Sequence, residues 1–160
     1  MKNEFDGELV DIFSDENIFL GEKTYKIDAK GRMNFPAKFR EKLEKGGFII
    51  CRWIKCLVIY PKLEWRKLIS DILSQPEDDN VINYKRWLLS KSEVGRFDNQ
   101  GRLLISNSLR KSVGIEKVAH LVGQGHYLEL WNLDKWNEIN EEITRRADRE
   151  GMSYFKKKEN

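Results

Sequence analysis

The chain contains 160 residues, 40% of them apolar and 34% charged, which allows one buried core or two small ones that pack together. No stretch approaches the ~18 consecutive apolar residues of a membrane-spanning helix, and the acidic amino terminus lacks the positive charge of a signal peptide. These features predict a cytoplasmic protein that has no membrane partner.

The net charge of +3 is unevenly distributed along the sequence. Residues 1–17 carry one lysine and six acidic side chains, a net charge of −5, which leaves +8 for residues 18–160. A basic body suits an anionic partner such as nucleic acid. The acidic segment is expected either to remain disordered or to fold back and shield a basic loop of the body.

Residues 18–74 are expected to form the first of two structural halves. The alternating stretch TYKI (24–27) predicts a short strand, and a tight turn follows it. Pro36 suits the first position of a short helix that Gly46 closes. Next, GFII and CLVIY predict the two strands of a hairpin, and a longer helix is expected to begin near Pro61.

Two further segments flank the second half. Residues 75–92 are expected to be a linker followed by a helix, VINYKRWLLSK, with Tyr84, Trp87 and Leu88 available for burial. Tryptophan and leucine at helical spacing normally face a core or a subunit contact, and we expect the same here. Residues 146–160 are expected to form a basic tail.

The second half, residues 93–145, repeats the order of elements in the first. Ser106 or Asn107 is expected to cap a short helix that Gly114 closes. The stretches VAHLV and HYLELW then predict another hairpin, and a longer helix is expected to begin near Asn132.

The pattern Asp-x-x-Gly-Arg occurs once in each half, at residues 28–32 and 98–102. In both copies another arginine follows eight residues after the first, at Arg40 and Arg110. Such self-similarity indicates that the chain consists of two copies of one unit. Two units with too few strands to close alone would complete each other in a pseudo-two-fold barrel.

The repeated pentapeptide has two possible roles. An aspartate can accept hydrogen bonds from amides within a turn, and glycine supplies a positive φ, so the aspartate and arginine could simply hold the turn together. Alternatively, arginine can contact guanine, asparagine or glutamine can contact adenine, and lysine can hold phosphate. In this second role the candidate DNA-contacting residues are Lys30, Arg32, Asn99, Gln100 and Arg102.

Neither a metal site nor a catalytic site is expected. The pairs Cys51-x4-Cys56 and His120-x5-His126 are separated by 63 residues, whereas a zinc finger separates its pairs by about 12–15. The cysteines are better interpreted as reduced, partly buried side chains of a hairpin. Motifs of hydrolases, metalloproteases and nucleotide-binding enzymes are absent from the sequence, so we expect no enzyme, no cofactor and no small-molecule substrate.

Three stretches resemble the MraZ family of bacterial transcriptional regulators, which is associated with the division and cell-wall gene cluster. They are FLGEKTYKIDAKGRMNFPAKFR, GRFDNQGRLLISNSLR and LVGQGHYLELWNLDKW, and the resemblance covers residues 18–145. The aromatic-x4-Trp segments that end at Trp65 and Trp136 add to it. Ser106 departs from the proline that is common in the family at this place.

The resemblance implies an α+β, mainly β fold, in which two tandem AbrB-like swapped-hairpin halves form a pseudo-two-fold barrel with flanking helices. It also implies a ring-shaped homo-oligomer that binds short direct repeats in double-stranded promoter DNA and is associated with the nucleoid. The DNA-facing loops would be residues 28–32 and 98–102, which adds Asp28, Gly31, Asp98 and Gly101 to the candidate DNA-contacting residues. Residues 1–17 would be an extension, either native or the product of a mis-called start. An AbrB-type antitoxin and a ring-forming scaffold without DNA binding are the alternatives.

Overall fold

The computed structural model describes residues 18–154 and 156, so the acidic segment 1–17 lies outside the described residues. The first half contains β1 (Glu22–Lys26), β2 (Arg32–Met33), α2 (Ala37–Glu44), β3 (Phe48–Arg52), β4 (Leu57–Pro61) and α3 (Lys62–Leu73). The remaining elements are α4 (Asp79–Ser90), β5 (Ser92–Val94), β6 (Leu103–Leu104), α5 (Asn107–Ser112), β7 (Val118–Gly123), β8 (Leu128–Trp131), α6 (Leu133–Glu150) and the 3-10 helix η1 (Gly151–Tyr154). None of these helices is both long enough and apolar enough to span a membrane.

The order of elements predicted from the sequence is confirmed, and so are several helix ends. The side chain of Ser106 caps α5 by accepting a hydrogen bond from the backbone N–H of Leu109 at 3.2 Å. Gly114 closes the same helix with φ of 71°. Asn132 caps α6 by accepting from the backbone N–H of Lys135 at 3.0 Å.

Other helix ends differ from the expectation. Pro36 precedes α2 as its cap instead of occupying its first position. Gly47, and not Gly46, takes the positive φ (82°) beyond α2, and its N–H donates to the carbonyl of Leu43 at 3.0 Å. Helix α6 continues to Glu150, because nothing in its sequence breaks the helix before Gly151.

The sheet combines strands of both halves. Six strands pair antiparallel in the order β1-β7-β8-β4-β3-β5, while β2 and β6 pair in a separate two-stranded sheet. The corresponding strands of the two halves are β1 and β5, β3 and β7, and β4 and β8. When each strand is replaced by its counterpart, the same order is obtained in the opposite direction, so the sheet has pseudo-two-fold symmetry. Strand β1 of the first half thus pairs with the hairpin of the second, and β5 pairs with the hairpin of the first.

The closed barrel predicted from the sequence is wrong for the described residues. Strands β1 and β5 form the two edges of the six-stranded sheet, and neither pairs with the other. Edge strands can be protected without closure when they are short or charged. Strand β5 has only three residues, and β1 has the sequence EKTYK, which meets that condition with three charged side chains.

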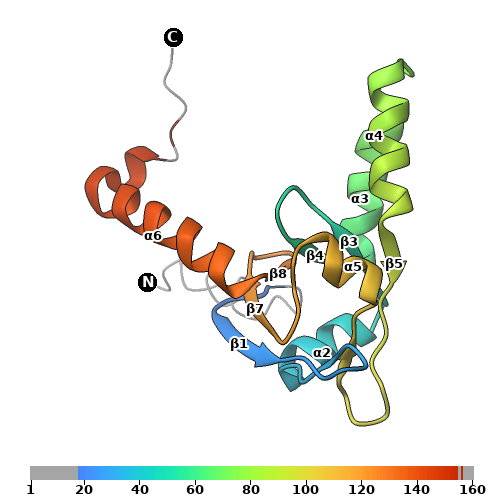
Figure 1. Cartoon of the computed structure of the whole chain (residues 1–160). Helices are drawn as coiled ribbons and strands as arrows, with labels where there is room; N and C mark the ends of the chain where they lie inside the picture. The colour runs from blue at the N-terminus through green and yellow to red at the C-terminus, as the bar shows by residue number, and fades with distance from the viewer. Residues whose placement is uncertain (1–17, 155, 157–160) are drawn as a thin grey trace, which may run out of the picture.

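Alternate side chains of the sheet face two separate cores. Ile50 and Ile59 point to a core closed by α2 and α5, whereas Cys51 and Tyr60 point to a core closed by α3, α4 and α6. Trp136 is buried in this second core, and Trp65 and Trp87 are partly buried against other parts of the same cluster, as the helical spacing predicted. In Figure 1, α3 and α4 extend together to one side of the sheet, and α6 projects from another.

The two cysteines lie in the β3–β4 hairpin, as expected, but they are fully buried where partial burial was predicted. Both are free thiols. Burial raises the pKa of the Cys51 thiol to about 12 and also raises the pKa of Cys56. Both side chains therefore act as small apolar groups of the core at neutral pH.

Candidate nucleic-acid interface

The first Asp-x-x-Gly-Arg loop is organised around the carboxylate of Asp28. Its Oδ1 atom accepts hydrogen bonds from the backbone N–H groups of Lys30 and Arg32, both at 3.0 Å. Its Oδ2 atom accepts from Nε of Arg32 at 2.6 Å. The backbone N–H of Gly31 closes the turn by donating to the carbonyl of Asp28 at 3.0 Å. One aspartate therefore fixes both the backbone and the side chain of Arg32.

The second loop repeats these bonds one for one. Oδ1 of Asp98 accepts from the backbone N–H groups of Gln100 and Arg102, both at 2.9 Å. Oδ2 accepts from Nε of Arg102 at 2.7 Å, and Gly101 N–H donates to the carbonyl of Asp98 at 2.9 Å. The sequence repeat is therefore also a repeat of side-chain geometry.

Each loop requires its glycine for two reasons. Gly31 and Gly101 have φ of 79° and 73°, the left-handed region that is unfavourable for other residues. A Cβ atom at Gly31 would also collide with the carbonyl oxygen of Ile105, and one at Gly101 would collide with Nη1 of Arg40. Both close neighbours come from the opposite half of the chain.

These neighbours reveal two arginines that the sequence interpretation left out of the site. Arg40 on α2 reaches the second loop, where its Nη1 donates to the carbonyl of Gly101 at 3.4 Å. Arg110 on α5 lies against Gly31 of the first loop and donates from Nε to the carbonyl of Ile105 at 3.1 Å. Their common position, eight residues after each loop arginine, was the signal in the sequence. We regard both as positioning residues that support the loop of the other half.

A short antiparallel sheet joins the two loops. Strands β2 and β6 begin where the loops end, and Arg32 pairs opposite Leu104 while Met33 pairs opposite Leu103. Met33 and Leu103 are completely buried beneath the loops. The loop between β5 and α5 lies at the end of the molecule opposite the tip of α4 (Figure 1). Because the strands run antiparallel, the two arginine loops extend from opposite ends of a ladder that is only two residue pairs long.

The middle of each loop has polar side chains that are exposed to solvent. Lys30, Asn99 and Gln100 are exposed. The side chains of Arg32 and Arg102 keep 30% and 24% of their surface exposed, enough for contact with a ligand.

Hydrogen bonds lower the pKa of both loop aspartates. The backbone N–H of Arg32 makes the largest contribution to lowering the pKa of Asp28, and the Arg32 guanidinium and the Lys30 N–H add to it against a smaller opposing effect of desolvation. The pKa of Asp98 is lowered in the same way by Arg102 and Gln100. Both carboxylates therefore stay charged beside their arginines further into the acid range than an ordinary aspartate would.

This geometry confirms that the pentapeptide holds its own turn together, and it leaves donors available for a ligand. A guanidinium has five N–H donors, and Asp28 or Asp98 takes only the one on Nε. The terminal nitrogens remain suited to bidentate contact with guanine or phosphate. All nine predicted residues lie in the two loops, and their contact with DNA stays a prediction.

The histidines and cysteines do not add a second site. His120 is buried, with Nδ1 2.8 Å from the hydroxyl of Thr24 and its ring stacked on Trp136. Within residues 18–154 and 156, no group of three or more histidine, cysteine, aspartate or glutamate side chains is placed to hold a metal ion.

The fold and the loops define a class: a duplicated chain whose halves exchange strands and carry two matched arginine turns joined by one short sheet. The family described as "MraZ protein, putative antitoxin-like" matches residues 18–81 and 89–153, one match for each half. The chain belongs to the MraZ family.

Curated relatives agree with this assignment over most of the chain. The transcriptional regulator MraZ of Pediococcus pentosaceus is 35% identical over 134 residues, which cover 82% of this chain and 92% of the relative. The protein of the same name from Thermomicrobium roseum is 35% identical over 74% of this chain and 84% of its own length. A third, from Lachnoclostridium phytofermentans, is 29% identical over 86% of this chain and all of its own length. The relatives are named as regulators and not as enzymes.

Proposed function

We propose that this protein is a sequence-specific DNA-binding transcriptional regulator that reads promoter DNA with the loops at residues 28–32 and 98–102. The observation that carries the proposal is the duplicated loop, in which the same four hydrogen bonds hold an arginine in a fixed place in both halves. A preset arginine loses less conformational entropy on binding. The name of the relatives and the net charge of +8 over residues 18–160 support the same conclusion.

The target is short direct repeats in a promoter, most simply that of the division and cell-wall gene cluster. Subunits of the protein join head to tail into a ring, in which one face of a subunit meets a different face of its neighbour. Several weak loops then act together through a high effective concentration. The protein works in the cytoplasm, in association with the nucleoid.

One finding favours a second candidate. The description of the family includes the words "antitoxin-like", which agrees with the alternative of an AbrB-type antitoxin. Such a protein also binds DNA but usually has a single unit. The two family matches in this chain argue for the regulator. A scaffold without a DNA role would give no shift of promoter DNA in a gel.

The decisive experiment compares Arg32→Ala and Arg102→Ala with the wild type in binding to promoter DNA. Each substitution is expected to weaken binding by about 1–3 kcal/mol per lost contact. The fold should remain intact, because Asp28 and Asp98 keep their hydrogen bonds to backbone amides. Arg66→Ala, on an exposed position of α3, removes the same charge elsewhere and is the matched control.

Unchanged binding by both folded loop variants would remove the arginines from the site. Equal weakening by the Arg66→Ala control would reduce the interaction to nonspecific charge. Affinity should also rise steeply from one direct repeat to three, with the assembly followed by native mass spectrometry. Equal affinity for one repeat and for three would contradict the multivalent ring.

A further inference from the structure

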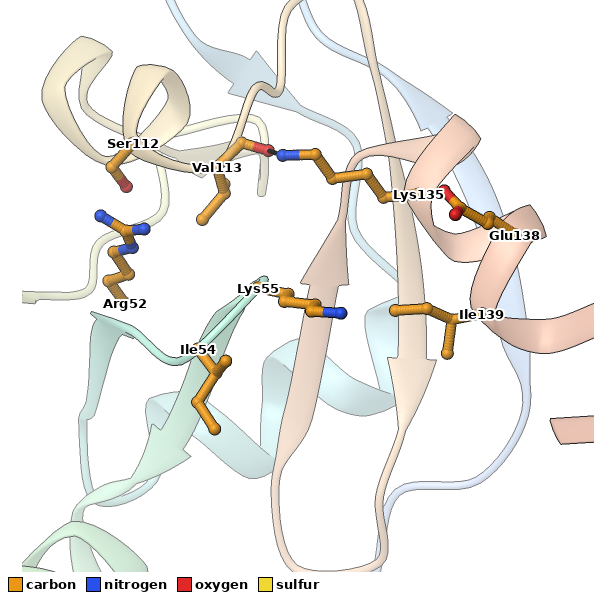
Figure 2. Close-up of a pocket in the computed structure, with 8 residues that line it drawn as sticks. All are labelled: Arg52, Ile54, Lys55, Ser112, Val113, Lys135, Glu138 and Ile139. Carbon is orange, nitrogen blue, oxygen red and sulfur yellow. Dashed lines mark hydrogen bonds between the residues drawn. The ribbon is translucent and has the colours of Figure 1, made fainter. Parts of the chain in front are cut away.

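A pocket lies between the two halves, away from the loops. Its walls come from the β3–β4 turn of the first half, from the carboxyl-terminal end of α5, and from the first two turns of α6 (Figure 2). The cavity has a volume of about 310 Å³, close to the lower limit of ~300–1,000 Å³ for small-molecule sites. It therefore suits a ligand of about one ring and one charged group.

Three cations from separate elements surround this pocket. Arg52 ends β3, Lys55 lies in the following turn, and Lys135 lies on α6, so that Figure 2 shows their nitrogens around one central space. Glu138 is the one carboxylate in the lining. None of the three cations forms an ion pair with a carboxylate among residues 18–154 and 156. The lining therefore has a net charge of +2, which matches a phosphate monoester at neutral pH.

The guanidinium of Arg52 is only partly satisfied by its surroundings. Its Nε atom is shielded from solvent and has no hydrogen-bond acceptor among the described residues. Its guanidinium contacts the ring of Trp87, 5.9 Å from the ring centroid, which compensates a cation only in part. Removing such a group from water costs free energy that a nearby anion would offset.

The pocket also has apolar walls. Ile54, Val113 and Ile139 line it, and Ile54 is 70% exposed at the rim. Lys135 is held in place by a hydrogen bond of 3.3 Å from Nζ to the carbonyl of Val113. Cationic donors next to aliphatic side chains suit a ligand with an anionic head and an apolar body.

We propose that this pocket binds a small organic phosphate, with Arg52, Lys55 and Lys135 around the phosphate group and the isoleucines against the organic part. Arginine and lysine are the usual protein partners of phosphate. The binding itself does not depend on the proposed function of the loops.

The position of α5 gives the pocket a route to the first loop. Ser112 and Val113, at one end of this six-residue helix, line the pocket, and Arg110 of the same helix lies against Gly31. A phosphate that shifts α5 would shift the support of the first loop. This second step, an effect of the ligand on promoter binding, rests on the proposed function.

The test uses isothermal titration calorimetry on the full chain with phenyl phosphate as the probe. Inorganic phosphate and benzyl alcohol serve as ligands that carry only the charge or only the apolar body. Phenyl phosphate should bind more tightly than inorganic phosphate, and benzyl alcohol should not bind measurably. Lys55→Gln and Lys135→Gln should each lower the affinity for phenyl phosphate roughly tenfold, which is the effect of one charged hydrogen bond.

Lys62→Gln, on an exposed position of α3, removes the same charge outside the pocket and should leave binding unchanged. Circular dichroism checks that each variant is folded. The proposal is overturned if phenyl phosphate does not bind at millimolar concentration, or if Lys62→Gln weakens it as much as Lys55→Gln does. It is also overturned if the pocket variants bind phenyl phosphate normally but dissociate the oligomer or lose promoter DNA, because the pocket would then be a subunit or DNA contact.

The route through α5 is measured separately, as promoter affinity with and without phenyl phosphate in the wild type and in Lys55→Gln. A change in the wild type that is absent from the variant supports the route. Phosphate binding without any change in promoter affinity would contradict the route and leave the site itself established. Failure of the wild type to bind promoter DNA at all would contradict the proposed function and not the phosphate site.

Discussion

The two arginine loops have the same hydrogen-bonded turn and differ in the side chains that the turn exposes. Asp28, Gly31 and Arg32 make the same hydrogen bonds as their counterparts in the second loop. Between the aspartate and the glycine, however, the first loop has Ala-Lys and the second has Asn-Gln. The shared hydrogen bonds thus fix the shape of each loop, and the two middle residues determine which side-chain groups each loop presents to a partner.

The loops also differ in how they are supported. A Cβ atom at Gly31 would lie closest to a backbone carbonyl, that of Ile105, whereas a Cβ atom at Gly101 would lie closest to the end of a side chain, that of Arg40. Backbone atoms can hardly move aside, whereas the end of an arginine can take another rotamer. The first loop is therefore the more tightly enclosed of the two.

Alanine at the two glycines gives the largest expected difference between the loops. Gly31→Ala should lower the free energy of unfolding by about 2–4 kcal/mol, because a left-handed backbone and a clash with a carbonyl add together. Gly101→Ala should cost about 1–2 kcal/mol, mostly for the backbone conformation. Urea denaturation followed by circular dichroism measures both values.

Gly46→Ala is the matched control for this pair. Gly46 has no positive φ, and a Cβ atom there would meet no neighbour within 4 Å. The free energy of unfolding of Gly46→Ala should therefore hardly differ from that of the wild type. Equal losses of unfolding free energy in Gly31→Ala and Gly101→Ala would show that the two loops are enclosed with equal rigidity, and would contradict the tighter enclosure of the first loop.

Local features of both loops could be predicted from the sequence. Turn formation depends on residues within five positions, so Asp-x-x-Gly-Arg was sufficient to predict the turn that the structure shows. The cap at Ser106 and the glycine at 114 follow from equally local rules. Positions of hairpins and helices followed from the periodicity of apolar residues.

Features that depend on distant contacts could not be derived in this way. Arg40 and Arg110 support the opposite loop across the interface between halves, and their regular spacing in the sequence did not show which carbonyl each would reach. Closure of the sheet depends on whether β1 meets β5, two strands that are far apart in the chain. The sequence pattern of each strand is compatible with a barrel edge and with a free edge alike.

A smaller difference between the loops is expected in their response to acid. The pKa of both aspartates is lowered in the folded protein, chiefly by the N–H of Arg32 or Arg102. Their contribution to stability is therefore present above the ordinary carboxyl pKa of about 4 and is lost as the pH falls through the lowered value. Asp28→Asn and Asp98→Asn should each reduce the loss of unfolding free energy between pH 6 and pH 3.

The effect should be larger at Asp98, whose side chain is 19% exposed against 36% for Asp28, because solvent screens the second ion pair less. Asp148→Asn, on an exposed position of α6, controls for the removal of any one carboxylate. An identical pH dependence in the wild type and in both loop variants would mean that the ion pairs contribute nothing to stability.

The smallest expected effect on stability comes from exchanging the middle residues of the loops. Lys30→Gln combined with Gln100→Lys keeps the net charge and changes two exposed positions, so the free energy of unfolding should stay within about 0.5 kcal/mol. For promoter DNA, Lys30→Gln alone should reduce the slope of log affinity against log salt by about 1, because one phosphate contact is lost. Gln100→Lys alone should raise the slope by about 1, and the double exchange should restore it. With the slope restored, any remaining change in preference among operator sequences reports base contacts by Gln100, which phosphate binding cannot produce. A slope that Lys30→Gln leaves unchanged would show that Lys30 does not contact phosphate, and the difference in charge between the two loops would then have no effect on DNA binding.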